Sequence, residues 1–179
     1  SRIYELIGDN WTYHKLLLLI VPADKTLNEY ADRNSLSTEL FIGIFEENMS
    51  DFVVSPMLAY EKGRIVDTQY LHAMFALLDE NMCSIFSPFM SFILEFIHYV
   101  NNNKEMLIQN IEMGIIDDSI NISKEDCATL LSTIKPNKER AAQLREIFEV
   151  YPTSWPKKVW PNLELILSTC SGSFLECTD

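Results

Sequence analysis

Residues 85–100, IFSPFMSFILEFIHYV, form the longest apolar stretch of the chain. Ser87 and Pro88 are typical of a helix start, because serine caps the first turn and proline suits the first helical position. Apolar side chains then fall on nearly every side, which predicts a deeply buried helix. A membrane span is not expected, since Glu95 and His98 interrupt the stretch and a span needs roughly 20 apolar residues.

Helical patterns flank this stretch on both sides. A helix is predicted from residue 67, another over residues 104–113 with its end at Gly114, and a third after the capping box at residues 123–126. A fourth helix is expected after Pro136. Their apolar stripes are Tyr70, Leu71, Met74, Phe75 and Leu78; Leu107, Ile108 and Ile111; Cys127, Leu130, Leu131 and Ile134; and Ala141, Leu144, Ile147 and Phe148.

Strand patterns stand at the two ends of the chain. Residues 15–21, KLLLLIV, indicate a strand buried on both faces, and residues 40–45 and 52–54 are two further candidates, with a polar loop over 23–37. Alternating leucines predict a last strand over residues 163–169. The expected fold class is therefore α/β, with strands at both ends and a helix-rich middle. With 179 residues, one domain is expected.

Composition excludes several function classes. The net charge of −12 disfavours binding to nucleic acid or to an anionic membrane surface. The four cysteines lack the C-x-x-C spacing of zinc and redox sites, and they favour a reducing, cytoplasmic location. Only five glycines occur, so no glycine-rich phosphate loop is predicted. The three histidines, His14, His72 and His98, are far apart in sequence, and His72 and His98 are expected to be structural.

Two segments suggest a binding site. The Phe and Met residues around 86–93 suit either core packing or the wall of an apolar ligand pocket. Residues 163–174, LELILSTCSGSF, predict a strand that runs into a turn of small residues, where a flat ring could approach the backbone. Such turns are also common without a ligand.

From residue 55 onward the chain resembles the auxin-responsive Gretchen Hagen family of acyl-acid amido synthetases, and it is similar to an internal fragment of such an enzyme. The resemblance rests on five segments in the family's order: Ser55-Pro56, YLHAMFAL at 70–77, SIFS at 84–87, IQNIEMG at 108–114, and WPNLELI at 160–166 with SGSF at 171–174.

The resemblance implies part of the large N-terminal domain of an adenylate-forming enzyme. Such an enzyme activates a carboxylic acid with ATP and Mg²⁺ and transfers the acyl group to an amine such as an amino acid. It implies strands and loops over 1–66, acyl-pocket helices over 67–162, and a strand with a nucleotide-side turn over 163–179. The implied nucleotide contacts are Ser171, Gly172, Ser173 and Phe174, and the implied acyl-pocket residues are Phe86, Phe89, Met90, Phe92 and Ile93. No catalytic residue and no metal ligand is implied within the chain.

Departures from the family pattern leave a second hypothesis open. Nothing in residues 1–55 resembles the family's phosphate loop. Plant members carry an arginine in the acyl helix, and here Ser91 and Phe92 occupy that neighbourhood. The alternative is therefore a non-catalytic descendant of the family that acts as a binding or interaction module.

Overall fold

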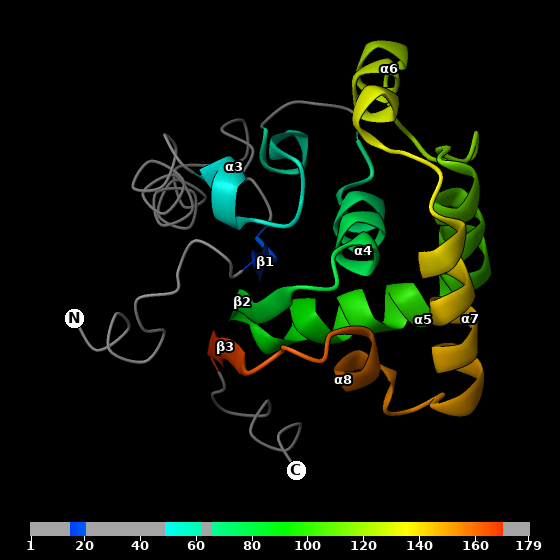
Figure 1. Ribbon diagram of the computed structural model, residues 1–179. Helices are drawn as coiled ribbons and strands as arrows, with labels where there is room; N and C mark the ends of the chain where they lie inside the picture. The colour runs from blue at the N-terminus through cyan, green and yellow to red at the C-terminus, as the bar shows by residue number, and fades with distance from the viewer. Residues whose placement is uncertain (1–14, 21–48, 62–65, 170–179) are drawn as a thin grey trace, which may run out of the picture.

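The structure is a computed structural model that describes residues 15–20, 49–61 and 66–169. Its sheet has three parallel strands in the order β1-β2-β3, which are Lys15–Leu18, Met82–Phe89 and Leu165–Thr169. The connections between the strands contain helices, because parallel strands cannot be joined by a tight turn. The expected α/β class is confirmed, with strands early and late in the chain and helices between them (Figure 1).

The two outer strands differ in burial. Leu17 and Leu18 of β1 are fully buried, which agrees with the continuous apolar sequence there. On β3, by contrast, Leu165, Ile166 and Leu167 are 39%, 52% and 46% exposed. The described part of the chain therefore covers neither face of β3 completely.

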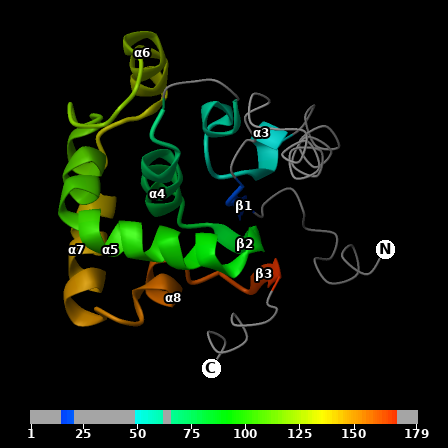
Figure 2. The same ribbon diagram turned by 180° about the vertical axis from the view of Figure 1, so that it is seen from behind.

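The helices follow with short connections. They are α3 (Met49–Phe52), the 3₁₀ helix η2 (Met57–Tyr60), α4 (Thr68–Leu78), α5 (Met90–Met113), α6 (Lys124–Thr133), α7 (Lys138–Val150) and α8 (Trp155–Val159). Figures 1 and 2 show α5 running from the sheet toward α7, with α4 on one side of α5 and α8 on the other. Helix α5 follows directly from the end of β2, and the first turns of α4 and α5 line one cavity together with the residues that follow β1.

Side-chain caps explain three of the helix starts. The Asp67 carboxylate accepts a hydrogen bond from the Tyr70 amide at 2.9 Å, and Asn137 caps α7 in the same way. The predicted capping box is confirmed, since Ser123 Oγ accepts from the Asp126 amide at 3.1 Å. The predicted helix end at Gly114 is also confirmed, because Gly114 adopts the left-handed conformation with φ of 68°.

The predicted helix start at Ser87 is wrong. Strand β2 continues to Phe89, and α5 begins at Met90. Pro88 is accommodated because the register of β2 against β3 shifts between Ser87 and Phe89, and such an irregularity tolerates a residue without an amide proton. Ser87 Oγ does not cap a helix. It donates to the carbonyl oxygen of Leu19 at 3.0 Å and so ties β2 to the end of β1.

The two helices predicted within residues 87–113 are one. Helix α5 is continuous over 24 residues, through the asparagines at 101–103 that lie between the two predicted helices. Tertiary contacts hold this region in the helix, since Trp155 Nε1 donates to Asn101 Oδ1 at 2.9 Å. The helix is also not buried on every side: Ile93 and Phe96 face the core, whereas Leu94 is 46% exposed.

The predicted strand at residues 52–54 is largely wrong. Helix α3 ends at Phe52, and only Val53 forms an isolated parallel bridge, to Leu16. The strand predicted at residues 40–45 and the loop at 23–37 lie outside the described residues.

An aromatic cluster and one buried arginine join the helices. Trp155 and Trp160 lie 5.5 Å apart between ring centroids, and both are almost fully buried. Arg140 of α7 is 2% exposed and donates to the carbonyl oxygens of Leu77 at 2.7 Å and Val159 at 3.1 Å. Arg140 thus connects the end of α4 to the end of α8.

Candidate functional site

The carboxyl ends of the parallel strands meet the first turns of α4 and α5. Ligands of open α/β sheets bind at this edge. A cavity of about 50 Å³ lies here, which we call the His72 hollow. It is lined by residues that follow β1 and by residues of α4 and α5: Leu19, Ile20, Thr68, Gln69, His72, Phe92, Glu95 and Phe96.

His72 is the most buried polar side chain of the hollow. Only 5% of it is exposed, and its Nδ1 lies 2.6 Å from Ser55 Oγ. Burial lowers the pKa of His72 to about 4, so the ring is neutral near pH 7. No other described residue forms a hydrogen bond with the ring, which leaves Nε2 for the hollow.

A tyrosine fixes the other side of this histidine. The Tyr60 ring lies 5.5 Å from the His72 ring, and Tyr60 Oη donates to the carbonyl oxygen of Leu18 at 3.1 Å. Burial raises the pKa of the Tyr60 phenol, which therefore stays protonated. Ser55, Tyr60 and His72 thus form a neutral polar group directly beneath the end of β1.

The five implied acyl-pocket residues lie around the junction of β2 and α5, but only Phe92 lines the hollow. Phe89 is 51% exposed and meets the Phe92 ring edge-on at 5.7 Å. Phe86 lies on β2 and Met90 begins α5, and both are half-buried. Ile93 is only 5% exposed and belongs to the core.

The implied nucleotide contacts Ser171, Gly172, Ser173 and Phe174 lie outside the described residues. The strand that leads to them is described, and it pairs directly with β2. Ser168 of β3 lies opposite Ser87 of β2, and its Oγ is a buried polar atom without a hydrogen-bond partner in the described structure. The edge that leads toward the predicted nucleotide turn therefore carries an unused polar group.

Sequence reasoning missed most of the polar lining. Thr68, Gln69 and Glu95 look like ordinary surface residues of amphipathic helices in the sequence. Ser55 and His72 are 17 residues apart, and their contact depends on the path of the intervening chain. The signal that could have found the pair is the proximity of Ser55-Pro56 and the Y-x-H segment within the family resemblance.

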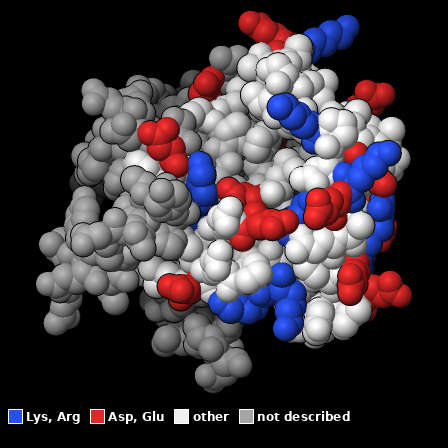
Figure 3. All heavy atoms as spheres, viewed as in Figure 1, with Lys and Arg blue, Asp and Glu red and all other residues white. Residues whose placement is uncertain are grey.

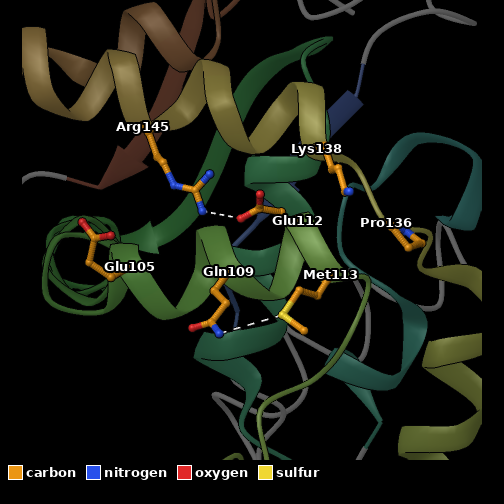
Figure 4. Close-up of a pocket in the computed structure, with 7 residues that line it drawn as sticks. All are labelled: Glu105, Gln109, Glu112, Met113, Pro136, Lys138 and Arg145. Atoms are coloured by element: carbon orange, nitrogen blue, oxygen red, sulfur yellow. Dashed lines mark hydrogen bonds and ion pairs between the residues drawn. The ribbon is translucent and has the colours of Figure 1, made fainter.

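A second cavity lies between α5 and α7, on the far side of α5 from the sheet edge. It has a volume of about 590 Å³ and is lined by charged and polar side chains: Glu105, Gln109, Glu112, Met113, Pro136, Lys138 and Arg145 (Figure 4). Arg145 forms an ion pair with Glu112, which lowers the pKa of that carboxyl group. Because its charges are partly paired and the groove is open, it is the weaker candidate for a specific site.

The family assignment comes from comparison with known proteins. The model of the "GH3 family N-terminal domain" matches residues 5–176. The chain belongs to the GH3 family. This confirms the resemblance seen in the sequence. No curated protein matches the chain.

Two solved GH3 structures share the fold of this chain. A "GH3.15 acyl acid amido synthetase" matches with a TM-score of 0.72 and 19% identity over 98% of the chain. A second, "AtGH3.15 acyl acid amido synthetase in complex with 2,4-DB", matches with a TM-score of 0.64 and 19% identity over 95% of it. The chain spans only 30% of the length of each of these GH3 proteins.

The described residues of this GH3 chain form no group of three or more metal-ligating side chains. Within the same residues, no helix is long and apolar enough to cross a membrane. Charged side chains of both signs intermingle on the face in Figure 3, where the described residues show no continuous basic patch.

Proposed function

We propose that this chain supplies the acid-binding wall of a cytoplasmic acyl-acid amido synthetase. In this function a carboxylate attacks the α-phosphate of ATP to form an acyl adenylate and release pyrophosphate, and an amine such as an amino acid then displaces AMP to form the amide. Family membership over residues 5–176 supports the proposal. The single structural observation that carries it is the His72 hollow, where Phe92 of α5 faces the sheet edge at which ligands of such folds bind.

The chain's own contribution would be binding and exclusion of water. Phe92 and Phe96 present apolar surface, while the neutral Ser55–His72 pair supplies one fixed hydrogen-bonding group. Apolar walls with a few placed polar atoms orient a small acid and keep water from the reactive acyl–phosphate anhydride.

The described residues hold neither ATP phosphates nor Mg²⁺. They contain no cluster of metal-ligating side chains, so they do not fit the metal. The nucleotide contacts proposed from the resemblance are Ser171, Gly172, Ser173 and Phe174. The orphaned hydroxyl of Ser168 at the end of β3 supports a polar ligand near that turn.

Calorimetric titration of the protein expressed from its complete gene tests this assignment. Acyl acids and ATP are titrated separately into the wild type, Phe92→Ala and Phe148→Ala. Phe148 is a buried aromatic residue that packs on Trp155 at 5.0 Å, away from the hollow, and therefore controls for a general core defect.

We expect Phe92→Ala to weaken acid binding with ATP affinity unchanged, and Phe148→Ala to lower stability without that selectivity. Equal loss of both ligands in Phe92→Ala would refute the acyl-wall assignment. A protein that binds acids but neither binds nor consumes ATP would instead be a non-catalytic binding module of the family.

A further inference from the structure

The polar wall of the His72 hollow is unusual for a site that takes a carboxylic acid. Three of its lining residues, Thr68, Gln69 and His72, come from the first turns of α4, and Glu95 comes from α5. Phe92 and Phe96 complete the lining from α5. The hollow is therefore apolar on one side and polar on the other.

Glu95 carries the only formal charge among these described lining residues, because burial keeps His72 neutral near pH 7. Glu95 is exposed at the rim of the hollow, and no hydrogen bond or ion pair to it exists in the described part of the chain, so its carboxylate is solvated and open to a ligand. A carboxylate without a partner raises the cost of placing a second anion beside it and favours a cation or a hydrogen-bond donor.

His72 points to the same chemistry. Only 5% of its side chain is exposed, and its Nδ1 already forms a hydrogen bond with Ser55 Oγ. In the tautomer in which Nδ1–H donates to Ser55 Oγ, Nε2 is an acceptor without a hydrogen-bond partner among the described residues, and a ligand donor in the hollow can reach it.

The size of the hollow limits what it can hold. A volume of about 50 Å³ exceeds the share of one water in the liquid, about 30 Å³, by less than twofold. It therefore suits one small terminal group of an acid. Gln69 and Glu95 also line a neighbouring groove of about 490 Å³, so the hollow borders a space large enough for more of a ligand.

We infer that the hollow selects acyl acids whose far end carries a protonated amino group, held between the Glu95 carboxylate and His72 Nε2. The acid's own carboxylate would then lie away from Glu95. This inference rests on the proposed function and names the substrate class of that site.

Two matched acids test the inference on the protein expressed from its complete gene. The para-(aminomethyl)benzoate ion carries an ammonium group where para-ethylbenzoate carries a methyl group of similar size. Affinities are measured by calorimetry near pH 7 for the wild type, Glu95→Gln and Glu105→Gln. Glu105 is an exposed residue on the same helix, away from the hollow, so it controls for the loss of one negative charge.

We expect the wild type and Glu105→Gln to bind para-(aminomethyl)benzoate about fivefold more tightly than para-ethylbenzoate. An ion pair of about 1 kcal/mol between the ammonium group and Glu95 gives a preference of this size. Glu95→Gln should abolish this preference, so that the two acids bind with similar affinities. Equal affinities of the wild type for both acids would overturn the inference and leave the proposed function standing.

A third ligand, para-methylbenzylamine, separates the two claims because it has the ammonium group and no carboxylate. If it binds in a Glu95-dependent manner while neither acid binds, the proposed function fails and the cation selectivity of the hollow holds. If none of the three ligands binds, both fail.

Discussion

Arg140 offers the sharpest test of how the helices are held together. Its guanidinium group donates to the carbonyl oxygen of Leu77, at the end of α4, and to that of Val159, at the end of α8. It also lies 3.4 Å from a carboxylate oxygen of Glu80, which is 56% exposed. Burial lowers the pKa of Arg140, but an arginine remains protonated near neutrality.

The substitution Arg140→Met keeps much of the aliphatic volume and removes every donor. Two buried carbonyl groups then lose their partners, and at about 1–3 kcal/mol each the loss of stability should be about 3 kcal/mol after the recovered desolvation of the charge. Glu80→Gln removes only an exposed ion pair and should cost less than about 1 kcal/mol. Urea unfolding, followed by the fluorescence of the nearby tryptophans, measures both.

The two variants separate two explanations of the buried charge. If Arg140→Met costs less than about 1 kcal/mol, the backbone contacts contribute little and our account of this region is wrong. If Glu80→Gln costs as much as Arg140→Met, then the ion pair, and not the two carbonyl groups, fixes α7 against α4.

Three further predictions follow from local geometry. His72 should make the fold acid-sensitive: its pKa is about 4 when folded against roughly 6.5 when unfolded, so the unfolded state binds more protons between these values. The contribution of neutral His72 to the free energy of unfolding is full above about pH 6.5. By about pH 4 the wild type should therefore lose about 3 kcal/mol more stability than His72→Asn. Parallel stability curves for the two proteins would refute this. Gly114→Ala should lower the stability by about 3 kcal/mol, because the backbone at residue 114 is left-handed and the new Cβ would lie 2.6 Å from Pro136 N. An unfolding midpoint equal to that of the wild type would contradict this prediction. Trp160→Phe should lower the stability by about 1–3 kcal/mol, because Trp160 Nε1 donates to the Ala76 carbonyl oxygen at 2.7 Å and phenylalanine has no donor. A melting temperature equal to that of the wild type would argue against a role for this bond.

Much of the fold follows from local chemistry that the sequence displays. Residues 15–21 are apolar after Lys15 and end before Pro22, and residues 15–18 of them form the strand that this run predicts. Ser123 and Gly114 define helix ends by their own side-chain or backbone properties, and both were predictable for that reason.

The errors arise where tertiary contacts outweigh local preference. Ser87-Pro88 has the chemistry of a helix start, but pairing with β3 and the bond from Ser87 to Leu19 extend the strand by two residues beyond Ser87. Two helices are predicted on either side of residues 101–103, yet Trp155 holds Asn101 within one continuous helix. Neither partner is near in sequence, so no local pattern reveals it.

The candidate site was predictable only in its apolar half. Phe92 follows from the family resemblance and does line the hollow. Glu95 does not, because a glutamate on an amphipathic helix is typical of a solvated surface. His72 was expected to be structural, and its bond to Ser55 agrees with that expectation, but only the fold shows that its second nitrogen faces a cavity.

Exchange of labelled pyrophosphate into ATP tests whether this GH3 chain provides the acid-binding wall of an adenylate-forming enzyme. The protein expressed from its complete gene is assayed with and without a panel of acyl acids that includes para-(aminomethyl)benzoate. We expect exchange that depends on the acid. Its rate should fall in Phe92→Ala but not in Glu105→Gln. A folded protein that binds acids yet gives no exchange with any of them would contradict the account.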